Sequence, residues 1–420
     1  MGRSLCVWCV EPLLGMCMSI SLHPLTKNNL KIDGALARCQ LPWENLNLQD
    51  ADFAVRAVEQ LLRLAIDERA SDVHLVPSPA GLQIAFRQDG LLEPMGSFPP
   101  EVSPLIINRI KVLAQLLTYR TDLPQEGRLR LPEFPGELRA STFPTIHGEK
   151  VVVRLFIGSG QYRVLDELGY TPQVQLGLEQ ALLQTSGMLL LTGPAGSGKT
   201  TSAYACLRWL QAYRKGQCSL VSLEDPVEAI LPGVSQTQVR RGTEFNYALG
   251  LRSLLRQDPD VIFVGEIRDA ETAQTAFQAS LAGHLVISTF HAGSAGDAIC
   301  RLTDLGVEPF LLRSGLIAVL CQRLVKRLAK DRETSFSTRR YEGRFVAAEL
   351  MEPELHHLAR PIMRKVNGKR LEELAARHGF VPLREALEEA VRTGKTDWHE
   401  VYRILGTRPV DERRDVSEGL

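Results

Sequence analysis

An excess of charge of either sign is missing from this sequence of 420 residues, in which 49 lysines and arginines balance 49 aspartates and glutamates. Proteins that bind nucleic acid over a broad surface normally have a basic excess, so we expect no direct nucleic-acid binding. Long hydrophobic runs are missing too, because no stretch reaches the roughly 18 uninterrupted apolar residues of a membrane-spanning helix. Any role at a membrane would therefore require a partner.

The cysteines lack the pattern of a disulfide framework or of a zinc site. Eight of them are scattered along the chain, and a chain of this length needs no disulfides to fold, which favours a reducing cytoplasm. Cys6 and Cys9 have the spacing of metal ligands, but no second close pair completes a tetrahedral site. We therefore predict no zinc site.

The N-terminal segment, residues 1–49, lacks regular periodicity. Residues 1–25 are apolar and rich in methionine, but Glu11 and Pro12 interrupt them and no small-residue cleavage site follows, which argues against a signal peptide. We interpret the segment as irregular, either a disordered tail or the result of a misplaced start codon, with Met16 or Met18 as the true start.

A glycine-rich turn stands between an apolar run of strand length, residues 187–192, and a helical pattern that begins at Lys199. Such a turn directs backbone N–H groups onto a polyphosphate at a helix N-terminus, where the helix dipole favours anions. Lys199 would then reach the β- and γ-phosphates of a nucleotide, and the Thr200 hydroxyl would join the Mg²⁺ shell. A loop that has lost nucleotide binding is the alternative. The predicted phosphate-binding loop consists of Gly193, Pro194, Ala195, Gly196, Ser197, Gly198, Lys199, Thr200 and Thr201.

Hydrophobic periodicity divides the rest of the chain into domains, and we find no internal repeat. Residues 50–157 read as a small α+β domain, in which Asp89-Gly90 is the turn of a hairpin. The helices are expected near 54–66 and 104–117, and strands near 82–87, 128–131, 137–143 and 150–156.

The second expected domain, residues 167–328, is α/β with a parallel sheet, because short apolar runs alternate with helical stretches. These runs are residues 220–223, 261–264 and 285–290. The remaining predicted segments are a hinge linker at 158–166, a second linker at 329–344, a helical domain at 345–405 and a disordered tail at 406–420.

Acidic residues follow two of the apolar runs. Glu224 and Glu228 belong to an acidic turn after 220–223, and Glu266 follows 261–264. The carboxyl ends of parallel strands meet at one edge of a sheet, where phosphoryl transfer needs groups that orient Mg²⁺ and water. Solvated surface acids are the alternative interpretation.

Two histidines and several arginines are further candidates. His284 and His291 flank the run 285–290, which favours a role in sensing the γ-phosphate or a neighbouring subunit, although a lone histidine is more often structural. Arg252 and Arg256, four residues apart on a predicted helix, either neutralise the acids or reach phosphate as an arginine finger. Three further arginines lie on predicted strands of the small domain, either exposed or facing across the hinge: Arg128, Arg139 and Arg154.

Four motifs in this order resemble those of the secretion ATPases that power type II secretion and type IV pilus assembly. They are GPAGSGKTT at 193–201, an aspartate box SLEDPVE at 222–228, an unusual Walker B motif RQDPDVIFVGEIRD at 256–269 and a histidine box GHLVISTFH at 283–291. The resemblance extends over residues 50–405 and implies a RecA-like P-loop ATPase domain with a parallel central sheet, a small α+β domain before it and a helical tail after it.

The resemblance also implies roles for the candidate residues. Glu228 would be the catalytic glutamate of the aspartate box and Glu266 the Walker B glutamate, and His284 and His291 would position or sense the nucleotide. Arginines of the small domain would reach the nucleotide, ATP, as the two domains close on each other. Many relatives bind zinc through paired Cys-x-x-Cys motifs just after the block that matches QRLVKRL at 322–328, but no cysteine follows Cys321 here.

By this resemblance the chain is expected to be a homo-hexameric, ATP-hydrolysing motor in the cytoplasm, bound peripherally to the inner membrane. Its partners would be a polytopic inner-membrane platform protein and the pilin or pseudopilin machinery. A pilus-retraction or DNA-uptake motor of the same superfamily is the first alternative, and a nucleotide-binding scaffold subunit that does not hydrolyse ATP is the second. A recombinase-like DNA motor gains no support from the neutral charge balance.

Overall fold

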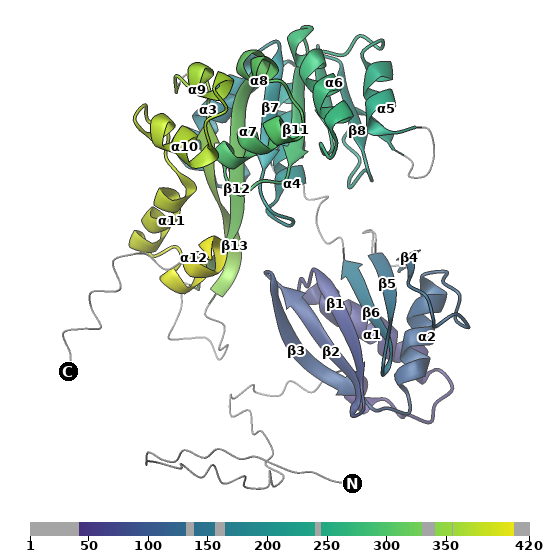
Figure 1. The fold of residues 1–420 in the computed structure, drawn as a ribbon. Helices are drawn as coiled ribbons and strands as arrows, with labels where there is room; N and C mark the ends of the chain where they lie inside the picture. Colours follow the sequence, from purple (N-terminus) through teal and green to yellow (C-terminus); the bar gives the residue numbers. More distant parts are fainter. Residues whose placement is uncertain are drawn as a thin grey trace, which may run out of the picture. The chain divides into compact units, whose positions relative to one another are not determined.

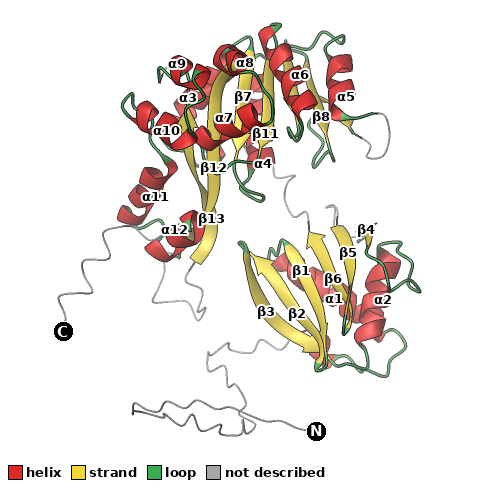
Figure 2. Cartoon of the chain, in the orientation of Figure 1, coloured by secondary structure: helices red, strands yellow, loops and turns green. Residues whose placement is uncertain are grey.

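The computed structural model describes residues 42–131, 138–155, 164–239, 245–329, 341–354 and 356–406 (Figure 1). The first 41 residues, most of the predicted hinge and second linker, and residues 407–420 lie outside the described ranges. Within those ranges no helix combines the length and apolar composition that crossing a membrane requires. The described residues form two sheets, each with its own helices (Figure 2).

The small domain is a six-stranded antiparallel sheet with helices on one face. Its strand order is β3-β2-β1-β6-β5-β4. The strands are β1 (Asp72–Ser78), β2 (Gly81–Gln88), β3 (Leu91–Phe98), β4 (Gln125–Leu129), β5 (Leu138–Thr145) and β6 (Gly148–Leu155), and the helices are η1 (Pro42–Asn45), α1 (Phe53–Asp67) and α2 (Ser103–Leu113).

Buried and outward-facing side chains alternate along the strands of the small domain, and the buried ones form its core. Every second side chain of β6, including Val151 and Val153, is buried against α1 and α2, while the intervening side chains face the other side of the sheet. The predicted hairpin turn is confirmed: Asp89 and Gly90 join β2 to β3 with φ of 48° and 85°, the positive values that a tight two-residue turn requires.

The large domain is built on a seven-stranded sheet of order β13-β12-β7-β11-β10-β8-β9, in which all neighbours are parallel except β13 and β12. Its strands are β7 (Gly187–Thr192), β8 (Leu220–Glu224), β9 (Ser235–Gln238), β10 (Val261–Val264), β11 (Leu285–Phe290), β12 (Leu316–Leu328) and β13 (Tyr341–Met351). Its helices are η2 (Leu165–Glu167), α3 (Pro172–Leu183), α4 (Lys199–Tyr213), α5 (Tyr247–Leu254), α6 (Ala270–Leu281), α7 (Ala295–Asp304), α8 (Pro309–Gly315), α9 (Ala359–Met363), α10 (Gly368–Ala376), α11 (Leu383–Arg392) and α12 (Trp398–Leu405).

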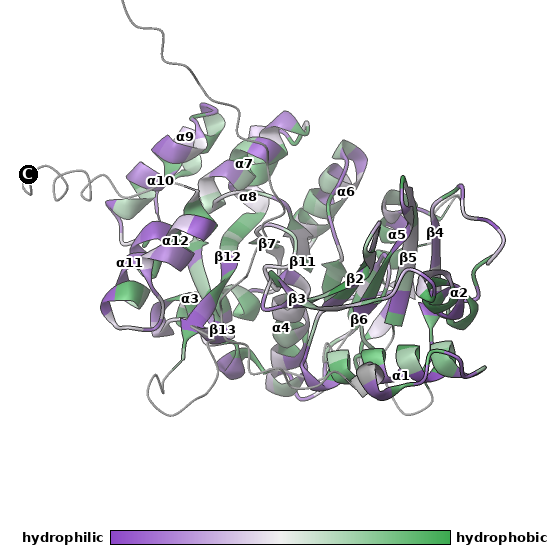
Figure 3. Ribbon diagram, turned by 90° about the horizontal axis from the view of Figure 1, so that it is seen from below, coloured by the Kyte–Doolittle hydropathy of each residue, from purple (hydrophilic) through white to green (hydrophobic). Residues whose placement is uncertain are grey.

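Helices cover both faces of this sheet, which explains why β7, β8, β10 and β11 are buried along their whole length. Leu189, Leu191 and Phe263 point into a core shared with α3 and α4, whereas Met188 and Leu190 point into a second core shared with α6, α7 and α8. The covering helices are amphipathic, and in Figure 3 α9 and α10 show hydrophilic residues beside hydrophobic ones. The predicted RecA-like α/β fold with a parallel central sheet is therefore confirmed.

One part of the sequence interpretation needs correction. Residues 341–344 were expected to end a linker and residues 345–351 to begin a helical domain, but all of them belong to strand β13, which pairs antiparallel with β12. Helices then follow as predicted, and α11 and α12 pack through Leu387 and Val401 against Val325 and Ala347 of this hairpin. The tail is thus attached to the edge of the central sheet.

Candidate nucleotide-binding site

The predicted phosphate loop connects the end of β7 to the start of α4. Gly198 is the N-cap of α4 with φ of 88°, a left-handed conformation that favours glycine. Gly193 has φ of 148°, and a Cβ there would lie 2.5 Å from the carbonyl oxygen of Gln322 and 2.6 Å from Ser197 Oγ. Both glycines are therefore required by the close approach of the loop to strand β12.

Lys199 closes the loop on itself. Its Nζ donates hydrogen bonds to the carbonyls of Gly193 (2.9 Å) and Pro194 (3.0 Å). Burial lowers the pKa of Lys199, and the nearby Glu266 carboxylate opposes that shift. The ammonium group thus lies over the loop, within the electrostatic field of Glu266.

Unpaired polar groups in the loop region fit a polyphosphate ligand. Among the described residues, the buried hydroxyls of Thr192 and Ser197 have no hydrogen-bond partner, and unpaired buried hydroxyls are costly unless a ligand or water satisfies them. The first N–H groups of α4 are also available to an anion, since a helix cannot satisfy them internally. Thr200, in the first turn of α4, is placed where a hydroxyl can serve a nucleotide-bound Mg²⁺.

Gln322 of β12 braces the loop, and the sequence analysis did not single it out. Its Nε2 donates to the carbonyl of Ser197 (2.7 Å), while its Oε1 accepts from the hydroxyls of Tyr170 (2.8 Å) and Ser202 (2.9 Å). All four groups are buried, so each hydrogen bond replaces one that water would have made. The only sequence signal was its place at the start of QRLVKRL.

Glu266 is the centre of a charged cluster just beyond β10. Its Oε1 lies 2.9 Å from His291 Nε2, and its Oε2 accepts from Arg268 Nε at 2.6 Å. Arg268 Nη1 lies 3.6 Å from Asp225 Oδ2, so the guanidinium connects the ends of β10 and β8. The structure thus brings together residues from three of the four motifs beside the Lys199 ammonium, and it adds Arg268, whose role the sequence did not indicate.

The aspartate box is organised around the buried carboxylate of Glu224. Tyr204 Oη, from α4, donates to Glu224 Oε2 at 2.5 Å, and Ser222 Oγ donates to Oε1 at 2.5 Å. The same tyrosine oxygen accepts from the backbone N–H of Glu228 at 3.2 Å. Burial and the nearby Glu224 charge raise the pKa of Glu228, the predicted catalytic glutamate.

The structure separates the two candidate histidines. His291 follows β11 at the carboxyl edge, but His284 precedes it, and its backbone carbonyl accepts from the N–H of Gly187 at the start of β7. A strand of this length spans about 20 Å, so His284 lies at the edge opposite the phosphate loop. Its Nδ1 is 3.0 Å from the carbonyl oxygen of Ala279, a local contact with the end of α6.

The three candidate arginines of the small domain lie in one row across its sheet. The strand register places Arg128 opposite Arg139, and Arg139 opposite Arg154. Arg154 is opposite Asp72 and donates to its carboxylate at 3.0 Å. The three arginines thus lie side by side on the sheet face away from α1 and α2.

The remaining candidates, Arg252 and Arg256, lie near the end of α5. Arg252 Nη1 donates to Glu271 of α6 at 2.9 Å, and Arg256 Nη1 donates to the backbone carbonyl of Arg252 at 3.1 Å. Neither of these hydrogen bonds involves the acids at the strand ends. Arg252 therefore joins two helices rather than neutralising Glu266.

The fold and the site together define a RecA-like P-loop domain, with a phosphate loop and acidic residues at the carboxyl edge of a parallel sheet. The family model for the type II/IV secretion system protein matches residues 47–403. The chain belongs to this family, and the resemblance inferred from the four motifs is confirmed.

Individual relatives support the same assignment. The chain is 39% identical over 375 residues to the type II secretion system protein HxcR of Pseudomonas aeruginosa, covering 86% of this chain and 79% of the relative. It is 37% identical over 374 residues to the type II secretion system ATPase E of Vibrio cholerae, covering 88% and 74%. It is 36% identical over 386 residues to the type IV pilus assembly ATPase TfpB of Acinetobacter baylyi, covering 84% and 65%.

Solved structures share the fold. The pilus retraction motor PilT, crystallised with ADP, has a TM-score of 0.59 and 25% identity, covering 84% of this chain and 97% of that chain. The ATPase DotB of Legionella pneumophila has a TM-score of 0.64 at 19% identity, covering 84% and 95%, which shows the fold alone.

Proposed function

We propose that the chain is the ATP-hydrolysing, hexameric motor that powers assembly of a type II secretion pseudopilus or a type IV pilus. The observation that carries this proposal is the arrangement of Lys199, Glu266 and His291 at one sheet edge of a chain whose family includes a type II secretion ATPase and a type IV pilus assembly ATPase. The names of the relatives indicate which machine the motor serves, and the residues of the site indicate that it hydrolyses ATP.

Each group at the site has a role in hydrolysis. The loop N–H groups and Lys199 bind and orient the β- and γ-phosphates of ATP, and Thr200 holds Mg²⁺, which neutralises phosphate charge when bound. Glu266 orients the attacking water, with His291 and Arg268 fixing its carboxylate. Glu228, whose pKa is raised, is a candidate to accept a proton at the same edge.

The second proposed contribution to hydrolysis is positive charge from the small domain. We propose that Arg128, Arg139 or Arg154 reaches the phosphates when the domains close within the ring, since an arginine finger stabilises charge that develops during phosphoryl transfer. The motor acts in the cytoplasm and is held at the inner membrane by a polytopic platform protein, through which it acts on pilins or pseudopilins. It has no direct contact with nucleic acid.

ATP turnover tests this assignment. We expect Lys199→Ala and Glu266→Gln each to lower turnover by about a hundredfold or more, because each removes a group that acts directly on phosphate or water, while the folded state is retained. The matched control is His284→Gln, at the opposite sheet edge, which should stay within about twofold of the native chain. Turnover that survives in Lys199→Ala refutes the site, and no turnover by the native chain favours the non-hydrolysing scaffold subunit.

A pilus-retraction motor is the second candidate, because PilT shares the fold over most of the chain. Hydrolysis does not distinguish the two, but the effect of deleting the gene does. Loss of surface pili or of secreted proteins supports an assembly motor, whereas accumulation of pili supports retraction. Neighbouring genes for a prepilin and a polytopic membrane protein would identify the machine served.

A further inference from the structure

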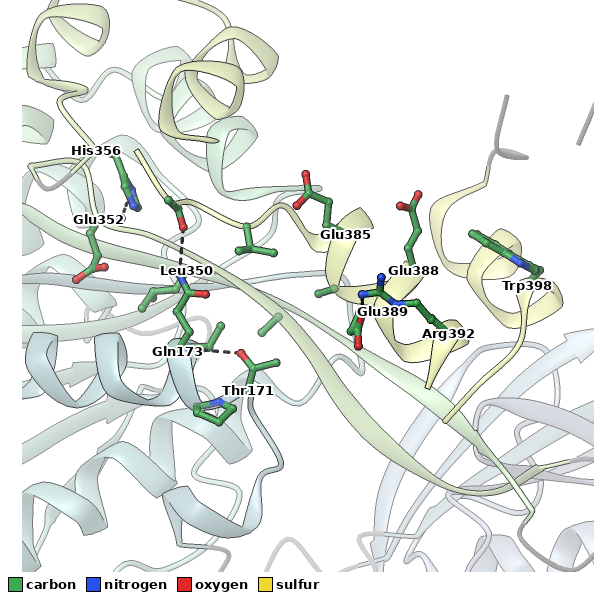
Figure 4. Close-up of a pocket in the computed structure, with 16 residues that line it drawn as sticks. Thr171, Gln173, Leu350, Glu352, His356, Glu385, Glu388, Glu389, Arg392 and Trp398 are labelled. Carbon is green, nitrogen blue, oxygen red and sulfur yellow. Dashed lines mark hydrogen bonds and ion pairs between the residues drawn. The ribbon is translucent and has the colours of Figure 1, made fainter. Parts of the chain in front are cut away.

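A groove of about 1060 Å³ lies along strand β13, outside the nucleotide site (Figure 4). Its walls are the start of α3, the segment that follows α10, and helix α11. The floor includes Val174, Ala348 and Leu350, so its lower part is apolar. A groove of this size accommodates several side chains of a peptide.

Acidic side chains surround this apolar floor. The lining includes four glutamates and one arginine, Arg392, so its net charge is 1 − 4 = −3. Burial lowers the pKa of His356, which also lines the groove, so this histidine adds no positive charge near neutral pH. Figure 4 shows Glu352 and His356 at one end and Arg392 at the other, with Leu350 between them.

Helix α11 supplies three of the glutamates as one stripe. Glu385, Glu388 and Glu389 have the spacing of one helix face, while Leu383 and Leu387 bury the opposite face in the core. Like charges three and four residues apart destabilise a helix, and among the described residues Glu389 is the only one of the three that forms an ion pair, with Arg392. The stripe is therefore unfavourable for α11 alone and becomes favourable when a cation binds beside it.

Glu352 gives an independent indication from the other end of the groove. Within the described parts of the chain its carboxylate has no hydrogen bond and no ion pair, and burial alone raises its pKa. A partly desolvated carboxylate without a counter-ion gains more from a cationic ligand than an exposed one does. The carboxylate of Glu352 and the glutamates of α11 thus favour a positively charged ligand in the groove.

We propose that this groove binds a basic, amphipathic segment of another protein, whose apolar side chains cover Leu350 and Ala348 while its lysines or arginines pair with Glu352, Glu385 and Glu388. An anionic lipid surface or nucleic acid would be repelled by the net charge. A metal ion is not indicated, because no group of three or more His, Cys, Asp or Glu side chains within the described ranges is placed to hold one. The apolar floor distinguishes the groove from a merely acidic surface.

Binding of a synthetic probe to the full chain tests the proposal. The probe is a fluorescent helical peptide of about 18 residues, with leucine on one face and flanking lysines, and its affinity is measured by anisotropy without ATP, so that failure here is separate from failure of hydrolysis. We expect Glu385→Lys/Glu388→Lys to weaken binding by about tenfold or more, because pairing charges become repulsive. A peptide with glutamate in place of lysine, and one with alanine in place of leucine, should each bind at least about tenfold more weakly.

The matched control is Glu101→Lys/Glu126→Lys, which makes the same change in net charge at exposed positions of the small domain and should bind the probe within about twofold of the native chain. Glu385→Gln/Glu388→Gln tests the same pairing without introducing a positive charge and should lie between the native chain and the reversal. Equal weakening in both lysine variants means attraction by net charge only and overturns the proposal. Dissociation of an oligomer at saturating probe would also overturn the proposal, because it would mean that a second copy of this chain covers the groove.

Discussion

Tyr204 connects the phosphate-loop helix to the aspartate box, which makes Tyr204→Phe an informative perturbation. The hydroxyl donates to Glu224 at 2.5 Å and accepts from the N–H of Glu228 at 3.2 Å. Burial and the hydrogen bond to Glu224 raise the pKa of Tyr204, so the hydroxyl stays protonated and remains a donor. Phenylalanine keeps the ring that packs edge-on against Phe263 and removes these bonds together with a longer one from the N–H of Ala229 (3.4 Å).

The expected effects on stability and on catalysis differ in size. Loss of a hydrogen bond to a buried charged group costs about 1.5–3 kcal/mol in the free energy of unfolding. In turnover we expect kcat to fall by about 10- to 100-fold, because the backbone at Glu228 loses its anchor and small misplacements of a catalytic group have large effects. KM for ATP should change little, because the Tyr204 hydroxyl bonds to Glu224, Glu228 and Ala229 and not to the phosphate loop at 193–201.

Two control variants separate positioning from stability. Tyr213→Phe alters an exposed tyrosine of the same helix and should leave kcat unchanged. Ser222→Ala removes another hydrogen bond to Glu224 but retains the bond between Tyr204 and the backbone at Glu228. Steady-state kinetics and thermal unfolding are measured for all three variants. If Ser222→Ala and Tyr204→Phe lower kcat equally at the same loss of stability, Tyr204 does not position the backbone at Glu228.

Two further predictions concern the large domain. Gln322→Leu leaves the hydroxyls of Tyr170 and Ser202 and the carbonyl of Ser197 without this partner. The free energy of unfolding, measured by denaturant titration, should therefore fall by about 2–4 kcal/mol. An unchanged midpoint of the unfolding transition would show that Gln322 does not stabilise the loop. The second prediction concerns Glu349, whose pKa is raised by burial to about 7. Between pH 4.5 and 7 the folded state therefore keeps a proton that the unfolded state has lost. Because of this difference, the free energy of unfolding should decline by up to about 3 kcal/mol as pH rises through that range. Glu349→Gln should lack this decline in melting temperature, and an identical slope in both proteins would exclude the assignment.

The fold was largely predictable because its local signals agree with its tertiary structure. The runs 261–264 and 285–290 coincide with β10 and β11, since short apolar segments bounded by polar turns are typical of fully buried parallel strands. Tertiary pairing overrode local preference at 345–351, where the sequence Phe-Val-Ala-Ala-Glu-Leu-Met favours a helix by composition. Its pairing with β12 fixes it as a strand instead.

The candidate site was predictable where a residue acts through its place in a motif, but not where it acts through a distant partner. Lys199 and Glu266 follow from strand ends alone. Gln322 could not be found in this way, because its partners lie 120 or more residues away in the chain. His284 shows a limit that strand geometry itself sets: two residues that flank one strand lie at opposite edges of the sheet, so only one of them can be near the loop.

Two carboxylates, one on β13 and one on α10, connect the C-terminal helices to the start of α7, close to the nucleotide site. Glu349 of β13 accepts from the N–H groups of Ala295 (2.7 Å) and Leu383 (2.6 Å), the first residues of α7 and α11. Glu372 of α10 accepts from backbone and hydroxyl donors at the same end of α7. Helix α7 begins shortly after His291, so a displacement of this histidine can also move the start of α7. Such a movement would either shift α10 and α11 together with α7 or break these hydrogen bonds. The helix that presents the acidic stripe of the groove is therefore mechanically connected to the histidine that contacts Glu266.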